Sequence, residues 1–161
     1  LLRPVSRALA QLATLLNIVQ TSVLVANKLN LLTPVFLLGD AGNLGNAFPA
    51  AQLQALSLLA IESHAHGFAI GLVFFGFACL VRGFLIFKSG YLPRAIGLLL
   101  GLAGVSYLTN SLLLLLAPRL ASAVFPGVLV PAFVGELSFC LWLIIKGVNS
   151  ERWKERSATS G

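Results

Sequence analysis

The chain alternates between long apolar runs and short polar breaks, which is typical of a helical membrane protein. The sharpest break is Lys88-Ser-Gly-Tyr-Leu-Pro-Arg94, between two apolar runs. Each run has about 20 residues, enough for a helix to cross the hydrocarbon core of a bilayer at about 1.5 Å per residue. The break leaves no room for a folded loop. Residues 72–116 are therefore predicted to form a transmembrane helical hairpin.

The same pattern, followed along the whole chain, predicts four membrane-spanning helices. Their expected ranges are 7–31, 66–88, 95–117 and 128–148. Residues 50–62 are expected to form an additional surface helix that ends in a bend near residues 62–67. One straight helix over residues 50–88 would be about 58 Å long, nearly twice the thickness of the bilayer core. The predicted fold class is an all-α, polytopic transmembrane helical bundle.

The chain is expected to form a single membrane domain over residues 1–161. Residues 39–49 hold three glycines, two asparagines and a proline, and are predicted to form an extracytoplasmic loop. Residues 149–161 are predicted to form a polar cytoplasmic tail. Because the chain contains no methionine and opens directly on a helix start, we expect it to be the C-terminal part of a longer bundle.

Composition and charge agree with a lipid bilayer as the main partner. Hydrophobic residues make up 58% of the chain and charged residues only 10%, whereas soluble domains carry about 25% charged residues. The formal net charge of +6 lies at helix ends and forms no basic stripe, so nucleic-acid binding is not expected. If the N-terminus, the 88–94 turn and the tail share one side, nine of the eleven cations lie there. The positive-inside rule makes that side cytoplasmic, and the nine are Arg3, Arg7, Arg82, Lys88, Arg94, Lys146, Arg152, Lys154 and Arg156.

Two kinds of sequence feature predict how the helices pack. The first span carries a polar stripe at helical spacing, which we interpret as hydrogen-bonding glue toward partner helices, with a polar pathway as the alternative. Glycines let helix backbones approach closely. The predicted packing glycines are Gly67, Gly71, Gly97 and Gly101. A homo-oligomer or another membrane protein is a candidate partner for such faces.

Glu136 is the sharpest candidate functional residue because it lies near the middle of the fourth span. A charged, unpaired carboxylate there is costly, so it is expected to be protonated, paired or facing water. Asn110 lies at a similar depth, Arg82 lies deeper toward the cytoplasmic side, and Thr21 is on the first span. One interpretation is that Glu136 locks helix packing. The other is that these residues bind a ligand or relay protons.

Glu62, His64 and His66 are predicted to lie at the outer edge of the second span. Residues two apart on a helix point about 200° from each other, so the two histidines do not readily share a metal. We expect interfacial or capping roles, with a weak metal site, haem ligation or pH sensing as alternatives. No metal site or cofactor is assigned from the sequence. No nucleotide-binding loop, nucleophile elbow or zinc-protease motif is present, so an enzyme is the less favoured reading.

Several segments resemble the bacterial domain-of-unknown-function 4386 family of multi-pass membrane proteins. The segments are Leu2-Arg-Pro-Val-Ser6, Gly71-Leu-Val-Phe-Phe-Gly76, the 88–94 turn, residues 97–107, and Gly135-Glu-Leu-Ser138 through Leu141-Trp-Leu143 to Lys146-Gly-Val148. Glu62, His64 and Gly67 also match the family pattern, whereas His66 stands where an aromatic residue is expected. The resemblance implies helices upstream of Leu1, a bacterial origin and a membrane topology. It carries no established activity.

These observations predict an integral protein of the bacterial cytoplasmic (inner) membrane, with its C-terminus in the cytoplasm. The favoured hypothesis is a noncatalytic protein that binds or passes a small molecule or proton through interior polar groups. The first alternative is a structural or regulatory subunit that packs on a partner. The second alternative is a metal- or haem-dependent redox protein.

Overall fold

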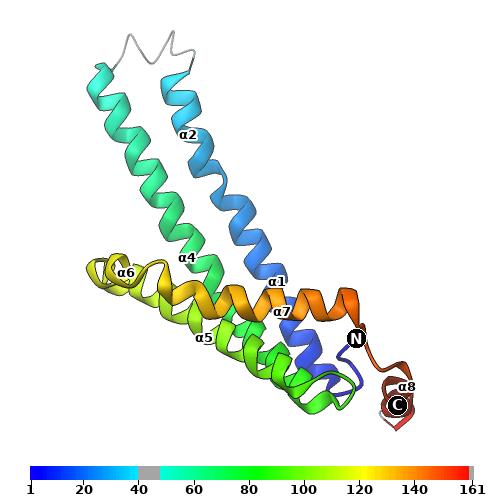
Figure 1. Cartoon of the computed structure of the whole chain (residues 1–161). Helices are drawn as coiled ribbons and strands as arrows, with labels where there is room; N and C mark the ends of the chain where they lie inside the picture. The colour runs from blue at the N-terminus through cyan, green and yellow to red at the C-terminus, as the bar shows by residue number, and fades with distance from the viewer. Residues whose placement is uncertain (40–47, 160–161) are drawn as a thin grey trace.

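The computed structural model describes residues 1–39 and 48–159, all of whose regular elements are helices (Figure 1). Residues 40–47 of the predicted loop lie outside these ranges. The elements are α1 (Arg7–Asn27), α2 (Leu29–Leu38), α4 (Ala50–Ser89), α5 (Arg94–Leu116), α6 (Pro118–Val124), a 3₁₀ turn η1 (Gly127–Leu129), α7 (Val130–Ile145) and α8 (Ser150–Thr159).

The predicted fold class is confirmed. Four segments are long and apolar enough to cross a membrane, and they are Arg7–Leu38, Ala50–Ser89, Arg94–Leu116 and Gly127–Ile145. The third and fourth lie within a few residues of the predicted spans. The first continues to Leu38 through α2, and the second begins 16 residues before residue 66, at Ala50.

The predicted bend near residues 62–67, and with it a separate surface helix over residues 50–62, is wrong. Helix α4 runs without interruption over 40 residues, a length of about 60 Å. No proline occurs between Pro49 and Pro93, so no backbone donor is lost along the helix. Gly67 does not break the helix because it packs against the side chain of Asn27 from the neighbouring helix.

A break occurs instead in the neighbouring helical segment that packs on α4, between α1 and α2. Leu31 bonds through its backbone N–H to the Lys28 carbonyl at 3.0 Å, three residues back, in place of the four-residue spacing of an α-helix. The carbonyl of Asn27 contacts Nδ1 of His64 on α4 at 3.3 Å. A side chain that enters the backbone ladder is a recognised cause of helix kinks.

The 88–94 turn closes the predicted hairpin between α4 and α5. Gly90 ends α4 with φ of 77°, a left-handed conformation that glycine adopts without strain. The hydroxyl of Ser89 donates to the Ile86 carbonyl at 2.7 Å and accepts from the Leu92 N–H at 3.2 Å. Pro93 precedes the first residue of α5 with extended ψ. The turn residues therefore satisfy their polar groups locally.

Helices α4 and α5 contact each other through two pairs of glycines. A Cβ added to Gly83 would lie 2.7 Å from the Gly97 carbonyl oxygen, and a Cβ on Gly97 would lie 2.7 Å from the Gly83 oxygen. Gly76 and Gly104 face each other in the same way, at 3.0 and 2.7 Å. Each pair is seven residues from the next on both helices. The contact thus uses heptad spacing, and a Cβ on Gly101 would meet nothing within 4 Å.

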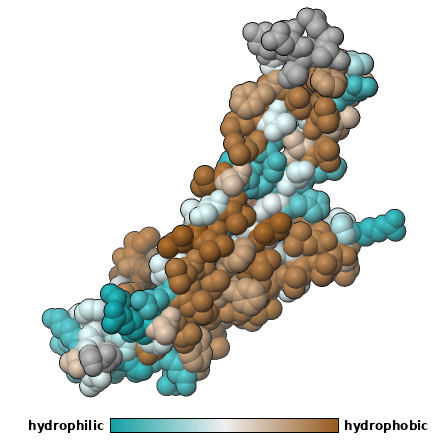
Figure 2. All heavy atoms as spheres, turned by 180° about the vertical axis from the view of Figure 1, so that it is seen from behind, coloured by the Kyte–Doolittle hydropathy of each residue, from teal (hydrophilic) through white to brown (hydrophobic). Residues whose placement is uncertain are grey.

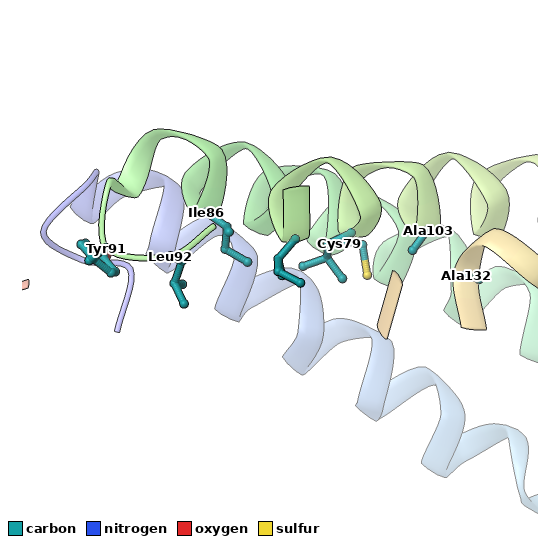
Figure 3. Packing of buried hydrophobic residues seen from close by; sticks show 8 residues of the cluster. Cys79, Ile86, Tyr91, Leu92, Ala103 and Ala132 are labelled. Carbon is teal, nitrogen blue, oxygen red and sulfur yellow. The ribbon is translucent and has the colours of Figure 1, made fainter. Parts of the chain in front are cut away.

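The helices stack in the order α1–α2, α4, α5, α7. Helix α4 packs against α1, α2 and α5, and α5 packs in turn against α7. At the α5–α7 contact, Gly135 lies against the backbone of Leu99, and the Ser106 hydroxyl donates to the Val128 carbonyl. The hydrophobic cluster shown in Figure 3 runs from Tyr91 and Leu92 in the turn to the buried alanines of α5 and α7.

The N-terminus, the 88–94 turn and α8 lie together at one end, as the sequence predicts (Figure 1). The Leu1 carbonyl accepts hydrogen bonds from the Tyr91 hydroxyl at 2.9 Å and from the Trp153 indole N–H at 3.0 Å. Arg152 donates to the Gly90 carbonyl at 3.3 Å. Burial raises the pKa of Tyr91, so its hydroxyl keeps the proton that it donates.

Hydrophobic residues cover most of the face shown in Figure 2, and hydrophilic residues gather at the end that holds both termini. Many large apolar side chains on α5 and α7 are exposed; examples are Leu98, Leu102, Phe133 and Ile144. A surface of this kind is stable in contact with lipid tails and aggregates in water. The four long apolar helices and this surface identify a membrane protein.

The glycine contacts predict a difference between two chemically identical substitutions. Gly83→Ala places a methyl group against the backbone of α5, and we expect it to lower the unfolding free energy by about 1–3 kcal/mol. Gly101→Ala meets open space and should be neutral or slightly stabilising because alanine favours helix. Thermal melting of both variants in detergent, followed by circular dichroism, tests this. Equal melting temperatures for the two variants would contradict the heptad glycine contact.

Candidate functional site

Four polar or reactive side chains from three helices converge inside the bundle. Glu136 on α7 and Tyr107 on α5 line the same pocket, of about 440 Å³, and the hydroxyl is placed to donate to the carboxylate. Arg82 on α4 is the cation whose charge acts on Glu136. Cys79, one turn before Arg82, is only 1% exposed and lies in the electrostatic field of both. Charge and hydrogen-bonding capacity are therefore concentrated where α4, α5 and α7 meet.

The polar groups of this cluster are only partly satisfied. Among the described residues, buried side-chain oxygens without a hydrogen-bond partner are Oε1 of Glu136, Oδ1 of Asn17 and Oγ of Ser111. Arg82 has no hydrogen bond or ion pair within the described ranges. Buried polar groups without a partner are rare in native structures. The cluster therefore retains free capacity to bind another polar group.

An open groove runs along α1 and meets this cluster at Arg82. Its first part, of about 790 Å³, is bounded by the N-terminal residues, α1, Arg82 and Phe139 of α7. Its second part, of about 640 Å³, is lined by Asn17, Thr21 and other residues of α1, again with Arg82. Thr14 borders both parts. The polar stripe of α1 thus faces this open groove, not a partner helix within the described chain.

The predicted ligand-binding residues are distributed unevenly over these features. Arg82 and Thr21 line the groove, whereas Glu136 lines the separate pocket between α5 and α7 and interacts with the charge of Arg82. Asn110 is half-buried on α5, and no described contact joins it to Glu136. The residue that does lie beside Glu136 is Tyr107, whose ring also packs against Phe75 at 5.2 Å between centroids.

His64 forms a polar contact with the end of α1. The side-chain amide of Asn27, which is 7% exposed, donates to the His64 carbonyl at 2.9 Å and contacts Nδ1 of its ring at 3.0 Å. Asn30 donates to the Asn27 side-chain oxygen at 2.9 Å. His66 is exposed, and its Nδ1 contacts only the Glu62 carbonyl of its own helix, at 2.9 Å. The two histidines therefore have separate surroundings.

Among the described residues, no three histidine, cysteine or acidic side chains lie together in a way that would hold a metal ion. Glu62 is exposed on α4. Gly67 and Gly71 face Asn27 and Leu24 of α1, so both lie at a helix contact.

Tyr107, Asn17 and Asn27 are the site residues that the sequence reasoning left out of its candidate set. The signal for Tyr107 was available in the glycine pattern. Pairing Gly76 with Gly104 and Gly83 with Gly97 fixes the antiparallel register of α4 and α5, which sets Tyr107 within reach of Phe75. Asn27 gives no comparable signal, because its partner His64 lies 37 residues away.

With this geometry in place, a family comparison gives the class of protein. A family profile described as "Domain of unknown function (DUF4386)" matches residues 1–147. The chain belongs to this family, as its motifs suggested.

A curated relative comes from Archaeoglobus fulgidus and bears the name "Uncharacterized protein". It is 29% identical over 147 residues, a stretch that covers 91% of this chain and 70% of the relative. No solved structure matches the chain significantly. The predicted bacterial origin stays a prediction, because this relative is archaeal.

The contact between Asn27 and His64 yields a stability prediction. Asn27→Ala removes the donor to the His64 carbonyl and leaves a void beside Gly67, so we expect a loss of about 1–3 kcal/mol in the free energy of unfolding. Asn30→Ala, the matched control, removes a single hydrogen bond at a less buried residue and should cost less than 1 kcal/mol. Denaturant or thermal unfolding in detergent measures both. A larger loss for Asn30→Ala would argue against Asn27 as the centre of this contact.

Proposed function

We propose that this protein is a noncatalytic membrane protein that binds a small molecule in the groove between α1, α4 and α7, with Glu136 linked to binding through Arg82. The observation that carries the proposal is the position of Arg82. It borders both parts of the groove, and its charge acts on the half-buried Glu136 of α7. A ligand in the groove would therefore change the electrostatic surroundings of Glu136.

Proton linkage is part of this proposal. The charged or titratable groups that face Glu136 are Arg82 and Cys79 from α4 and Tyr107 from α5. Arg82 is the one cation in this set, so an anionic ligand would compete with the Glu136 carboxylate for the same positive charge. Ionisable residues inside membrane proteins commonly mark ligand pathways and proton relays.

A second candidate function is a structural or regulatory subunit that packs on a membrane partner. The exposed polar stripe of α1 favours it, since Gln11, Thr14 and Thr21 would otherwise contact lipid. In that case Glu136 serves helix packing, and a neutral isostere should satisfy the same hydrogen bond to Tyr107.

Glu136→Gln separates the two functions. The amide keeps the shape of the side chain and an acceptor for Tyr107, but removes the charge opposite Arg82. We expect the melting temperature of the wild type in detergent to depend on pH and on compounds from a metabolite panel, and both dependences to be reduced in the variant. Glu62→Gln, which neutralises an exposed carboxylate on α4, should behave like the wild type. Identical responses of all three proteins would instead favour the structural subunit.

The orientation proposed for the chain is supported by the distribution of cations. The end that holds both termini carries most of the Lys and Arg side chains, and the positive-inside rule assigns it to the cytoplasm of a cell membrane. A C-terminal green fluorescent protein fusion is expected to fluoresce, and a C-terminal alkaline phosphatase fusion to be inactive. The opposite pair of results would reverse the orientation.

A further inference from the structure

The groove along α1 has the features of a site for an amphiphile with an anionic head. Arg82 lies seven residues before α4 ends at Ser89, or about 10 Å along the helix. It is partly exposed to the groove and has no ion pair or hydrogen bond within the described ranges. Glu136 interacts with Arg82 through its charge but makes no ion pair with it. The guanidinium donors therefore remain available to an anion in the groove, where an unpaired cation is costly.

The polar groups around Arg82 favour a headgroup that carries hydroxyls as well as the anion. Asn17 lines the groove, and its Oδ1 has no hydrogen-bond partner. Rotation of the side-chain amide would therefore present an acceptor to a ligand hydroxyl. The Thr14 hydroxyl donates to the Ala10 carbonyl at 2.9 Å and the Ser22 hydroxyl to the Ile18 carbonyl at 2.8 Å. Their protons are already used within α1, which leaves both oxygens as acceptors. Arg82 is the cation that lines both parts of the groove, and Arg3 lines the first part as well.

Apart from Arg3 and Gln11 in the first part, the remaining walls are mostly apolar and open toward the surface. Leu2, Ala13 and Leu15 line the first part of the groove, with Phe139 from α7, and Ile18 and Val25 line the second part. Several of these side chains are exposed; examples are Leu15 at 59%, Ile18 at 56% and Val25 at 67%. In a bilayer such a surface contacts acyl chains. A ligand can therefore enter sideways from the membrane, with its chain against the apolar wall.

We propose that the groove binds an anionic phospholipid, with the headgroup phosphate at Arg82 and a headgroup hydroxyl at Asn17. Guanidinium groups bind phosphate oxygens through two parallel hydrogen bonds, which favours this assignment. The inference rests on the proposed function, because it names the class of ligand for the same groove.

The test uses the whole chain purified in detergent, with dioleoyl phosphatidylglycerol as the probe and dioleoyl phosphatidylcholine as the lipid control. Phosphatidylglycerol is expected to raise the melting temperature of the wild type by several degrees, and phosphatidylcholine by much less. In Arg82→Gln the phosphatidylglycerol shift should be largely lost. In Lys88→Gln, which removes an exposed cation from the same helix, the shift should be kept.

Three further measurements keep the test decisive. Arg82→Lys retains the positive charge but cannot form two parallel hydrogen bonds to a phosphate. We expect it to keep a reduced melting-temperature shift with phosphatidylglycerol. This variant also tests the proposal if Arg82→Gln does not fold. Asn17→Leu should reduce the preference for phosphatidylglycerol over phosphatidic acid, because that preference depends on the headgroup hydroxyls. Soluble glycerol phosphate, lacking acyl chains, should give little or no shift.

Several results would overturn the proposal. Equal shifts from both lipids would indicate that a protein segment or lipid tails alone cover the groove. Equal losses in Arg82→Gln and Lys88→Gln would indicate a general basic surface, and a full shift from glycerol phosphate would indicate a water-soluble ligand. If phosphatidylglycerol stabilises the protein through Arg82 while Glu136→Gln responds to pH like the wild type, the lipid site stands and the proposed linkage to Glu136 fails.

Discussion

Direct backbone contact between α4 and α5 is the constraint on which the rest of the structure depends. Gly83 meets Gly97 through backbone atoms, and Gly76 meets Gly104 through backbone atoms flanked by the side chains of Leu80 and Leu108. Lipid tails are as apolar as leucine, so burial of apolar surface does not drive helices together inside a membrane, and close van der Waals packing takes its place. The two contacts also fix the register, which sets the distance between Tyr107, Cys79 and Arg82. Without them, the polar cluster would have no fixed geometry.

The sequence predicts those parts of the fold that depend on nearby residues, and it predicts less well the parts that depend on contacts between distant helices. The hairpin, the four spans and the shared end of the termini follow from hydrophobic run length, turn residues and cation positions, all of which act locally. The bend expected near residues 62–67 from bilayer thickness does not form. Bilayer thickness limits the length of an isolated helix, whereas α4 is packed along its length against neighbouring helices. In the structure α2 packs along α4. The helix break lies between α1 and α2, and α4 stays continuous.

The candidate site is only partly predictable, for a related reason. Glu136 and Arg82 stand out because charge is costly in an apolar span, whatever its neighbours. Their surroundings depend on which helices touch, and α5 separates α4 from much of α7. That order of packing brings Tyr107 beside Glu136. Gly135 packs against Leu99 and Ala103, about two helical turns before Asn110, so Asn110 does not lie at the expected depth of Glu136. The sequence predicts that the polar stripe of α1 bonds to partner helices. Within the described chain the stripe instead lines an open groove.

The unbroken length of α4 has a mechanical consequence. A straight helix about 60 Å long bends little between its ends, so it acts as a rod that joins the region around Ala50 to the turn at Ser89. Arg82 lies near the Ser89 end of this helix, and the Asn27–His64 contact ties the helix to α1 about a third of the way from Ala50. The half of α4 that carries Arg82 is held against α5 at Gly76 and Gly83. A force applied at the Ala50 end would therefore be carried along one continuous helix to the α4–α5 contact and to the groove wall at Arg82.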